Sequence, residues 1–239
     1  MTSLTELDFL LSFRRDLHRH PELGGGEERT ARVVAEALGA VGVEVHRGIG
    51  GHGLVGVVHG EKPGPTVAHR ADMDALPVLE ATGLPFASET PGLMHACGHD
   101  VHTTIGVGLA RLAQERRASL AGRRVFLFQP NEEGAPGQGT GGAQAMVDDG
   151  VLERFGIEAM TALHCKPDLA VGQIGYCRGG AWASCDHYSI ELVGVQTHGA
   201  YPQLGRDPVV AAAELVAALA AIPSRRIDAR KPCVVSTCV

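Results

Sequence analysis

Segments typical of helices and segments typical of strands alternate along most of this 239-residue chain, and this alternation restricts the fold more than any other feature. The spacing of apolar residues predicts helices over residues 3–20, 27–41, 106–117 and 143–155, and strands over residues 53–59, 66–70, 124–129 and 159–164. The run at 124–129 is almost continuously apolar, as in strands that are buried on both faces of a sheet. The pattern therefore predicts an α/β domain with a mostly parallel sheet flanked by helices.

The pattern changes after about residue 180. A strand is predicted over residues 188–193, an Ala-rich helix over 208–222 and a second strand over 232–239. This β-α-β order predicts the first half of a smaller α+β domain, so we expect one domain over residues 1–182 and part of another over 183–239. The sequence ends inside the last apolar run, and an unprotected sheet edge of this kind tends to pair with other chains. We therefore expect the sequence to be C-terminally incomplete.

Composition argues against several functional classes. The net charge is −6 with no basic run, which argues against nucleic-acid binding. We expect no membrane span, because no apolar stretch comes near the roughly 20 residues that cross a bilayer, and the N-terminus lacks the features of a signal peptide. The six cysteines follow no disulfide framework, so we expect free thiols in the reducing cytoplasm.

Residues 94–102 place a thiol, three imidazoles and a carboxylate within nine residues. A single cysteine or histidine in a loop is usually structural, but five potential ligands so close together indicate a metal site. Cys97 and His99 are the strongest candidates, because alternate residues in an extended loop can point to one centre. A thiolate ligand argues against Mg or Ca and favours Zn, Ni, Co or Mn.

Two acidic clusters follow predicted strands. Glu132 and Glu133 come after the strand at 124–129, and Asp72 and Asp74 after the strand at 66–70. Adjacent side chains diverge, so one glutamate can bind a metal while its neighbour faces the substrate and transfers protons. Asp72 could support a ligand histidine. The alternatives are a solvated strand end for the glutamates and a helix-capping role for the aspartates.

Two further histidines are candidates because of their positions. His164 ends the strand predicted at 159–164, although a lone histidine there is more often a core residue. Sites in open α/β sheets form outside the carboxyl ends of the strands, so we expect His164 and the acidic clusters to meet at one edge. His198 lies in the second predicted domain and could join them only through domain closure or a partner chain.

Several motifs occur together in the order and spacing of a known family. They are Leu-His-Arg-His-Pro-Glu-Leu at 17–23, Arg-Ala-Asp-Met-Asp-Ala-Leu-Pro at 70–77, Met-His-Ala-Cys-Gly-His-Asp-Val-His-Thr at 94–103, Gln-Pro-Asn-Glu-Glu-Gly at 129–134, Ala-Leu-His at 162–164 and His-Gly-Ala-Tyr-Pro at 198–202. Together they closely resemble the amidohydrolase branch of the aminoacylase/carboxypeptidase metallopeptidase family. That branch includes hippurate hydrolases, N-acyl-amino-acid amidohydrolases and auxin-conjugate hydrolases.

The resemblance implies a catalytic domain with two divalent transition-metal ions, here residues 1–182. It also implies a lid domain that mediates homodimerisation, here the partial domain 183–239. The activity it implies is hydrolysis of the linear amide bond of an N-acyl amino acid or a similar small amide. Carried over residue by residue, the metal ligands would be Cys97, His99, Glu133 and His164. Glu132 would be the general base, Asp72 a supporting residue near the metal, and His198 the lid histidine that stabilises the oxyanion.

The chain also departs from the family pattern. Gln203 stands where the family usually has a histidine, and family members normally continue well beyond this length to supply a final histidine ligand. We therefore expect little or no amidase activity from these 239 residues alone. The alternative is a truncated, catalytically inactive chain that binds a metal or a partner. A structural zinc protein would need no catalytic base, and Glu132 argues against it.

Overall fold

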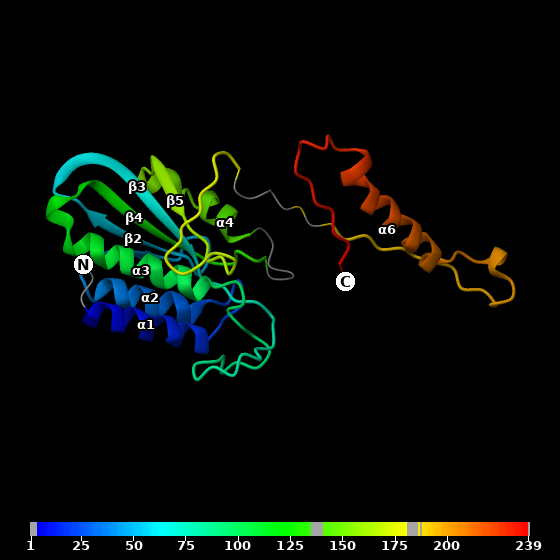
Figure 1. Cartoon of the computed structure of the whole chain (residues 1–239), viewed down its shortest axis with the longest axis horizontal. Helices are drawn as coiled ribbons and strands as arrows, with labels where there is room; N and C mark the ends of the chain where they lie inside the picture. Colours follow the sequence, from blue (N-terminus) through cyan, green and yellow to red (C-terminus); the bar gives the residue numbers. More distant parts are fainter. Residues whose placement is uncertain (1–3, 135–140, 181–185, 187, 239) are drawn as a thin grey trace. The chain divides into compact units, whose positions relative to one another are not determined.

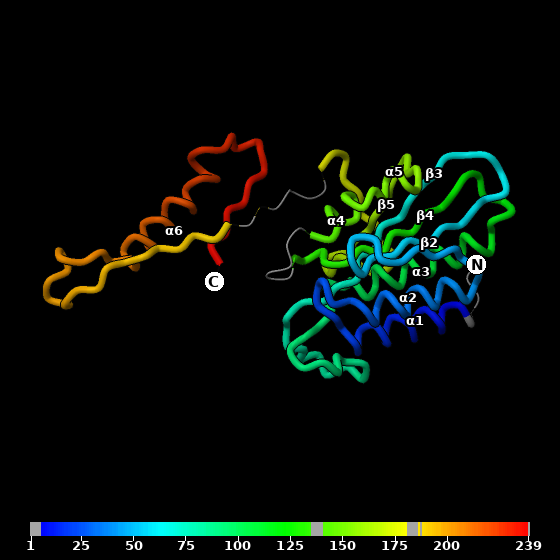
Figure 2. The backbone as a smooth tube through the Cα atoms, turned by 180° about the vertical axis from the view of Figure 1, so that it is seen from behind, coloured from blue at the N-terminus to red at the C-terminus, as the bar shows by residue number. Residues whose placement is uncertain are grey.

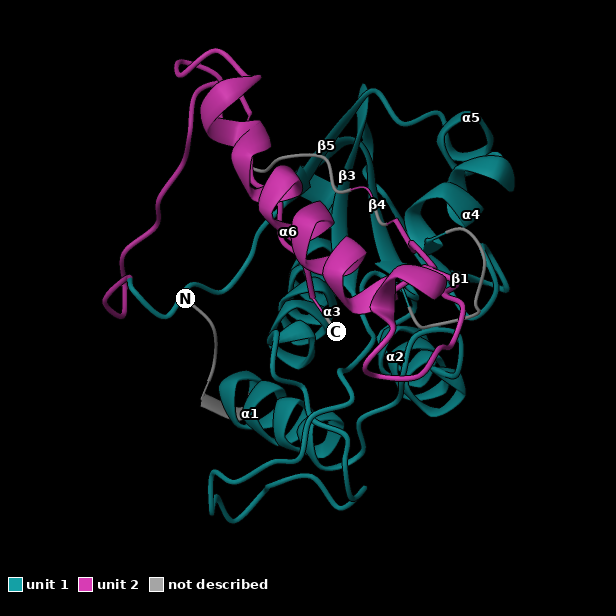
Figure 3. Ribbon diagram, turned by 90° about the vertical axis from the view of Figure 1, so that its right-hand side faces the viewer, with its two compact units in different colours: residues 1–168 teal, residues 169–239 magenta. Residues whose placement is uncertain are grey.

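The structure is a computed structural model that describes residues 4–134, 141–180, 186 and 188–238 (Figure 1). The chain divides into two compact units, residues 1–168 and residues 169–239, which Figure 3 shows in teal and magenta. The domain boundary expected from the sequence, at 182/183, lies further along the chain and stays a prediction. Each unit is described separately below.

A five-stranded sheet in the order β1-β2-β4-β3-β5 forms the centre of the first unit. Its strands are β1 (Glu44–Arg47), β2 (Leu54–His59), β3 (Lys62–Asp72), β4 (Ala121–Gln129) and β5 (Ala159–Ala162). β3 runs parallel to both β4 and β5, whereas β2 is antiparallel to β1 and β4. The predicted α/β class is confirmed, and the parallel arrangement holds for β3, β4 and β5.

The antiparallel part of the sheet follows from short connections. Only residues 60–61 separate β2 from β3, and a parallel connection needs a crossover of a dozen or more residues. The chain must therefore reverse direction between these strands. By contrast, the segment between β3 and β4 is long enough to include a helix, and these two strands are parallel.

Helices cover both faces of the sheet (Figures 1 and 2). On one side are α1 (Leu4–Arg19), α2 (Glu28–Gly39) and α3 (His99–Glu115), and on the other are α4 (Gly142–Asp148) and α5 (Val151–Phe155). Alternate residues of β4 pack into the two hydrophobic cores, one on each face of the sheet. Phe126 and Phe128 face α2 and α3, while Val125 and Leu127 face α4 and α5. Burial on both faces accounts for the continuous apolar run predicted as a strand.

Several predicted helix boundaries differ from the structure. The helix expected at 143–155 is interrupted because Gly150 adopts a left-handed conformation, with φ of 72°, between α4 and α5. The helix expected from residue 106 begins at His99 instead, and a short 3-10 helix, Arg117–Ser119, follows it. The first residue of the helix expected over 3–20 falls outside the described residues, and α1 is described from Leu4 to Arg19.

The second unit contains α6 (Pro208–Arg225) and a short 3-10 helix, Pro202–Leu204. The strands predicted at 188–193 and 232–239 are wrong for the described residues, in which the unit forms a single antiparallel bridge, Val195 with Arg206. A strand persists only where a neighbour satisfies its backbone groups. α6 is also long and apolar enough, by length and composition alone, to cross a membrane. The expectation that no stretch is long and apolar enough to cross a membrane is therefore wrong for α6. A single helix of this kind is weak evidence for a membrane span.

Candidate metal centre

The carboxyl ends of β3 and β4 meet the first turn of α3 at one edge of the sheet. Asp72 at the end of β3 is in register with Gln129 at the end of β4. Asp74 and the pair Glu132-Glu133 follow these strands. The expected convergence of strand ends is therefore confirmed for these two parallel strands.

His99 lies near these strand ends, as the first residue of α3. Its side chain is 1% exposed, and Nδ1 lies 3.1 Å from Oδ1 of Asp74. Nε2 is buried without a hydrogen-bond partner among the described residues. It lies 3.6 Å from a carboxylate oxygen of Glu133 and 3.9 Å from one of Glu132. An imidazole held at one nitrogen by a carboxylate, with the other nitrogen free, is typical of a metal-binding histidine.

The electrostatics at His99 favour positive charge. Burial would lower the pKa of His99, but the bond to Asp74 and the charges of Asp72, Asp74 and Glu132 raise it above its ordinary value. The carboxylates thus stabilise a proton on this ring when no cation is present. A bound cation would satisfy the same negative field, and it would release that proton.

Cys97 and His164 bring two more potential ligand atoms to His99. Sγ of Cys97 lies 3.4 Å from Nε2 of His164. The ligand atoms of Cys97, His99 and His164 lie within 4.8 Å of one another, as do those of His99, Glu132 and Glu133. Burial, with the nearby Glu133 carboxylate, raises the pKa of Cys97 to about 12. The free thiol is therefore neutral, and a cation would be needed to hold it as a thiolate.

These five residues, Cys97, His99, Glu132, Glu133 and His164, are called the metal centre below. The sequence placed His164 at the end of its strand, whereas β5 ends two residues earlier, at Ala162. His164 consequently lies in the following loop, where its Nδ1 is 2.7 Å from the backbone carbonyl oxygen of Cys165. The donor set of thiol, imidazole and carboxylate fits a borderline-soft divalent cation such as zinc.

Asp72 supports the metal centre through a histidine that the sequence did not single out. Its Oδ1 lies 2.6 Å from Nδ1 of His102, and Nε2 of His102 accepts the backbone N–H of Cys165 at 2.9 Å. His102 is therefore neutral, with its proton on Nδ1, and joins β3 to the loop that carries His164. The motif at 94–103 contained His102, but no spacing rule distinguished it from a ligand.

Asp72 is charged in this setting. Burial alone would raise its pKa, but the hydrogen bond from His102 and the charges of His99 and Arg70 lower the pKa to about 2. Arg70 donates to Asp72, and its Nε donates to Oε1 of Gln129 at 2.8 Å. The guanidinium thus joins the ends of β3 and β4 while balancing the buried carboxylate.

Glu132 differs from the buried carboxylates around it. Its side chain is 38% exposed, and Oε1 lies 3.9 Å from Nη2 of Arg70. Burial of the remainder raises the pKa of Glu132 above its ordinary value, although Arg70 opposes the shift. A partly exposed carboxyl group with a raised pKa, beside a possible cation site, is suited to taking up and releasing protons.

His198 belongs to the second unit. Its Nδ1 accepts the backbone N–H of Ala200 at 3.1 Å, and its ring lies 5.5 Å from the ring of Tyr201. Its expected role toward an oxyanion stays a prediction.

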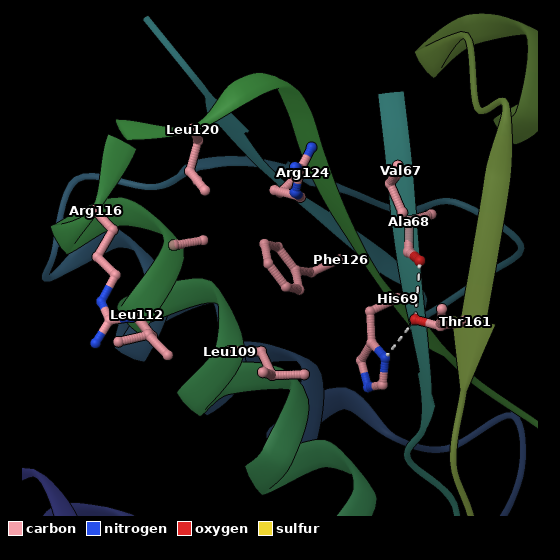
Figure 4. A pocket seen from close by; sticks show the side chains of 11 residues that line it. Val67, Ala68, His69, Leu109, Leu112, Arg116, Leu120, Arg124, Phe126 and Thr161 are labelled. Carbon is pink, nitrogen blue, oxygen red and sulfur yellow. Dashed lines mark hydrogen bonds between the residues drawn. The ribbon is translucent and has the colours of Figure 1, made fainter. Parts of the chain in front are cut away.

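A separate cavity of about 300 Å³ lies between the C-terminal half of α3 and the sheet (Figure 4). Its lining is mainly apolar and includes Leu109, Leu112 and Phe126. Figure 4 shows His69 at its edge, where Nδ1 lies 3.2 Å from Oγ1 of Thr161. No residue of the metal centre lines this cavity, so it is not part of the candidate site.

Comparison with known proteins agrees with these features. The profile of the peptidase family M20/M25/M40 matches residues 68–235. An N-acetyl-L-cysteine deacetylase of Bacillus subtilis is 41% identical over 219 residues, which cover 92% of this chain and 51% of the relative. A hippurate hydrolase of Campylobacter jejuni is 40% identical over 223 residues, which cover 93% of this chain and 56% of the relative. The chain therefore spans about half the length of the curated relatives it matches.

Two solved structures have the same fold. The YXEP protein of Bacillus subtilis, described as a dinuclear metal binding peptidase of the M20 family, matches with 42% identity and a TM-score of 0.69. The match covers 74% of this chain and 48% of that one. A putative aminohydrolase from methicillin-resistant Staphylococcus aureus matches with 36% identity and a TM-score of 0.74, covering 94% of this chain and 58% of that one.

Proposed function

The chain belongs to the peptidase family M20/M25/M40, and from this premise we propose that it carries the metal-binding portion of a hydrolase. The reaction is cleavage of the amide bond of an N-acyl amino acid or a similar small amide. Two relatives, an N-acetyl-L-cysteine deacetylase and a hippurate hydrolase, support this substrate class. We expect the protein to act in the cytoplasm as a homodimer joined through the lid domain.

The observation that carries the proposal is the position of Nε2 of His99. Among the described residues, this nitrogen is buried without a hydrogen-bond partner, and it lies near carboxylate oxygens of Glu132 and Glu133 and ligand atoms of Cys97 and His164. We propose Cys97, His99, Glu133 and His164 as ligands of two divalent transition-metal ions, drawn from zinc, manganese, nickel and cobalt. The description of a related structure as dinuclear supports the number of ions.

The catalytic roles fall to residues around these ligands. Bound divalent cations supply Lewis-acid activation of the amide carbonyl and of water. We propose that Glu132 removes a proton from the attacking water and delivers it to the leaving amine. Its pKa lies above the ordinary value of a glutamate because the side chain is partly buried, and this favours uptake of a proton in general acid–base catalysis. Asp72, held ionised, orients His102 and adds negative charge beside His99.

His198 is proposed as the donor to the oxyanion of the tetrahedral intermediate. This assignment rests on the resemblance of residues 198–202 to the family motif. A hydrogen bond offered where negative charge develops typically contributes a few kcal/mol to lowering the barrier.

Metal analysis of Glu132→Gln and Glu133→Gln tests the division of roles. In the purified 239-residue chain, Glu133→Gln should weaken zinc or cobalt binding by at least about 10-fold, because it removes an ionised ligand. Glu132→Gln should leave the metal content near that of the unaltered chain. Loss of metal in Glu132→Gln alone would show that the two roles are exchanged.

Hydrolysis of a panel of N-acyl amino acids tests the activity in a version of the protein as long as its relatives. There, Glu132→Gln should lower kcat by at least about 100-fold, the usual contribution of general acid–base catalysis. The second candidate function is metal binding without turnover, which needs only the clustered candidate ligands of the described residues. Tight metal binding with no hydrolysis of any panel member would support that alternative.

A further inference from the structure

Glu27 is a buried carboxylate close to the metal centre whose side chain the metal chemistry does not use. It is 0% exposed, and Oε1 accepts the backbone N–H of Asn131 at 2.6 Å. Asn131 directly precedes Glu132 and Glu133, and it lies 104 residues from Glu27 along the chain. Burying a carboxyl group costs free energy unless hydrogen bonds compensate for the lost contact with water. The contact between Glu27 and Asn131 therefore needs an explanation.

Capping of α2 does not explain Glu27. The residue occupies the N-cap position of α2, but its side chain makes no capping hydrogen bond. Glu22 fills that role, because its two carboxylate oxygens accept the backbone N–H groups of Arg29 at 3.0 Å and Thr30 at 2.7 Å. The carboxylate of Glu27 is directed to the segment after β4 instead.

The segment that Glu27 contacts is a strained turn. Asn131 has φ of +47° and is the one non-glycine residue with positive φ among those the structure describes. Such a conformation is unfavourable for residues that carry a Cβ, and Asn tolerates it better than most. It persists only where surrounding contacts hold it, and these contacts are therefore informative.

Contacts on several sides hold the turn. The backbone N–H of Asn131 bonds to Glu27, and that of Glu133 bonds to Oδ2 of Asp74 at 2.9 Å. The carbonyl oxygen of Asn131 accepts the N–H of Gly142 at 2.9 Å. A Cβ at Gly24 would come within 2.2 Å of Oδ1 of Asn131, so a side chain there would displace the turn. Glu27 and Asp74 thus hold the segment on either side of Glu132.

We propose that Glu27 is a positioning residue that fixes the left-handed turn at Asn131 and thereby directs Glu132 and Glu133 toward the metal centre. This inference rests on the proposed function, because it assigns a purpose to the direction of those two carboxylates. Glu27 acts through the backbone of residues 131–133 and touches neither substrate nor metal. Its removal should therefore affect the Glu133 ligand and spare the Cys97 ligand.

Cobalt binding to the purified 239-residue chain tests the proposal. Glu27→Leu removes the hydrogen-bond acceptor and fills its place with an apolar side chain. It should weaken cobalt binding by about 10–100-fold, as is usual for residues that orient metal ligands. Glu27→Gln should restore most of the affinity, because its amide oxygen can still accept from Asn131. Glu28→Leu is the matched control, since Glu28 is the exposed neighbour at the start of α2. It should bind like the unaltered chain.

The double variant with Glu133→Gln separates positioning from general loss of structure. If Glu27 acts through the 131–133 turn, Glu27→Leu should have little further effect once the Glu133 ligand is gone. The near-ultraviolet absorption from a cobalt–thiolate bond should persist in Glu27→Leu, while the visible bands change with loss of a carboxylate. An equal loss of affinity in both backgrounds, or unaltered affinity in Glu27→Leu, would overturn the proposal.

The same measurements distinguish failure of this inference from failure of the proposed function. If the unaltered chain shows no cobalt–thiolate absorption, or keeps it in Cys97→Ser, the metal centre is wrong and the role of Glu27 falls with it. If that absorption appears and depends on Cys97 while Glu27→Leu binds normally, only the role of Glu27 is wrong.

Discussion

Residues 1–168 and residues 169–239 use their apolar side chains in different ways. In the first unit, two buried clusters fill the space between the sheet and the helices on its two faces. In the second, no described residue is buried, and α6 exposes valines such as Val209, Val210 and Val216. Burial of apolar surface is the main stabilising term in folding. The first unit therefore has a source of cooperative stability that the described part of the second lacks.

Local interactions account for α6 instead. Pro208 occupies the first helical position, and Asp207 caps the helix by accepting the backbone N–H of Val209 at 2.8 Å. Alanine is frequent in the helix and has the highest helix propensity. Helices of similar length in this chain thus depend on different forces: α3 on tertiary packing, and α6 on propensity and capping.

The largest expected difference between the units concerns core truncation. Phe128 is fully buried, and Phe128→Ala should lower the free energy of unfolding by about 3–5 kcal/mol, because it removes apolar contacts and leaves a cavity. Val216→Ala in α6 should change it by less than about 0.5 kcal/mol. Urea denaturation followed by circular dichroism measures both. Similar losses in the two variants would show that α6 is buried in the protein in solution.

A smaller effect on the free energy of unfolding is expected when Asp72 is protonated in acid. The pKa of Asp72 is about 2, below the ordinary 3.8, so its charged form stabilises the fold above about pH 4. That contribution is lost as the pH falls through the folded-state pKa and amounts to about 2 kcal/mol. In metal-free protein, the free energy of unfolding should therefore fall between pH 4 and pH 2 more in the unaltered chain than in Asp72→Asn.

The matched control for this experiment is Asp168→Asn, whose exposed carboxylate pairs with Lys166. It should follow the pH dependence of the unaltered chain. If Asp72→Asn does so too, the buried network of Asp72 and His102 does not stabilise the first unit in this way.

The smallest expected effect is at the cap of α6. Asp207→Ala removes the acceptor for the first turn and should cost about 1 kcal/mol, whereas Asp207→Ser keeps an acceptor and should cost less. Amide hydrogen exchange across residues 208–225 should quicken about fivefold in the alanine variant, the factor that corresponds to this energy. Unaltered exchange would mean that contacts other than the cap hold this helix.

Part of this structure could be predicted from the sequence because its signals are local. The apolar run at 124–129 is a strand, and His99 lies in one cluster with Cys97 and in another with Glu132 and Glu133. β1 was missed because it is only four residues long and mostly polar. The strands expected at 188–193 and 232–239 failed in the described residues because an apolar run pairs only if a neighbouring strand is present.

The supporting contacts of the metal centre could not be predicted in the same way. Asp72 and His102 lie 30 residues apart, and Glu27 and Asn131 lie 104 apart. Such pairs depend on which strands become neighbours and on how the loops close. Nothing in the sequence around Glu27 indicated that Glu22, and not Glu27, would cap α2 with its side chain.

Residue types and their short-range order were enough to specify the α/β class and the kinds of side chain that gather at the candidate metal centre. Tertiary contacts specified which strands are neighbours in the sheet, the neutral state of His102 and, among the described residues, the unpartnered Nε2 of His99. The physical reason is that propensity and spacing act over a few residues, whereas burial and electrostatic pairing depend on groups that approach each other only in the folded chain.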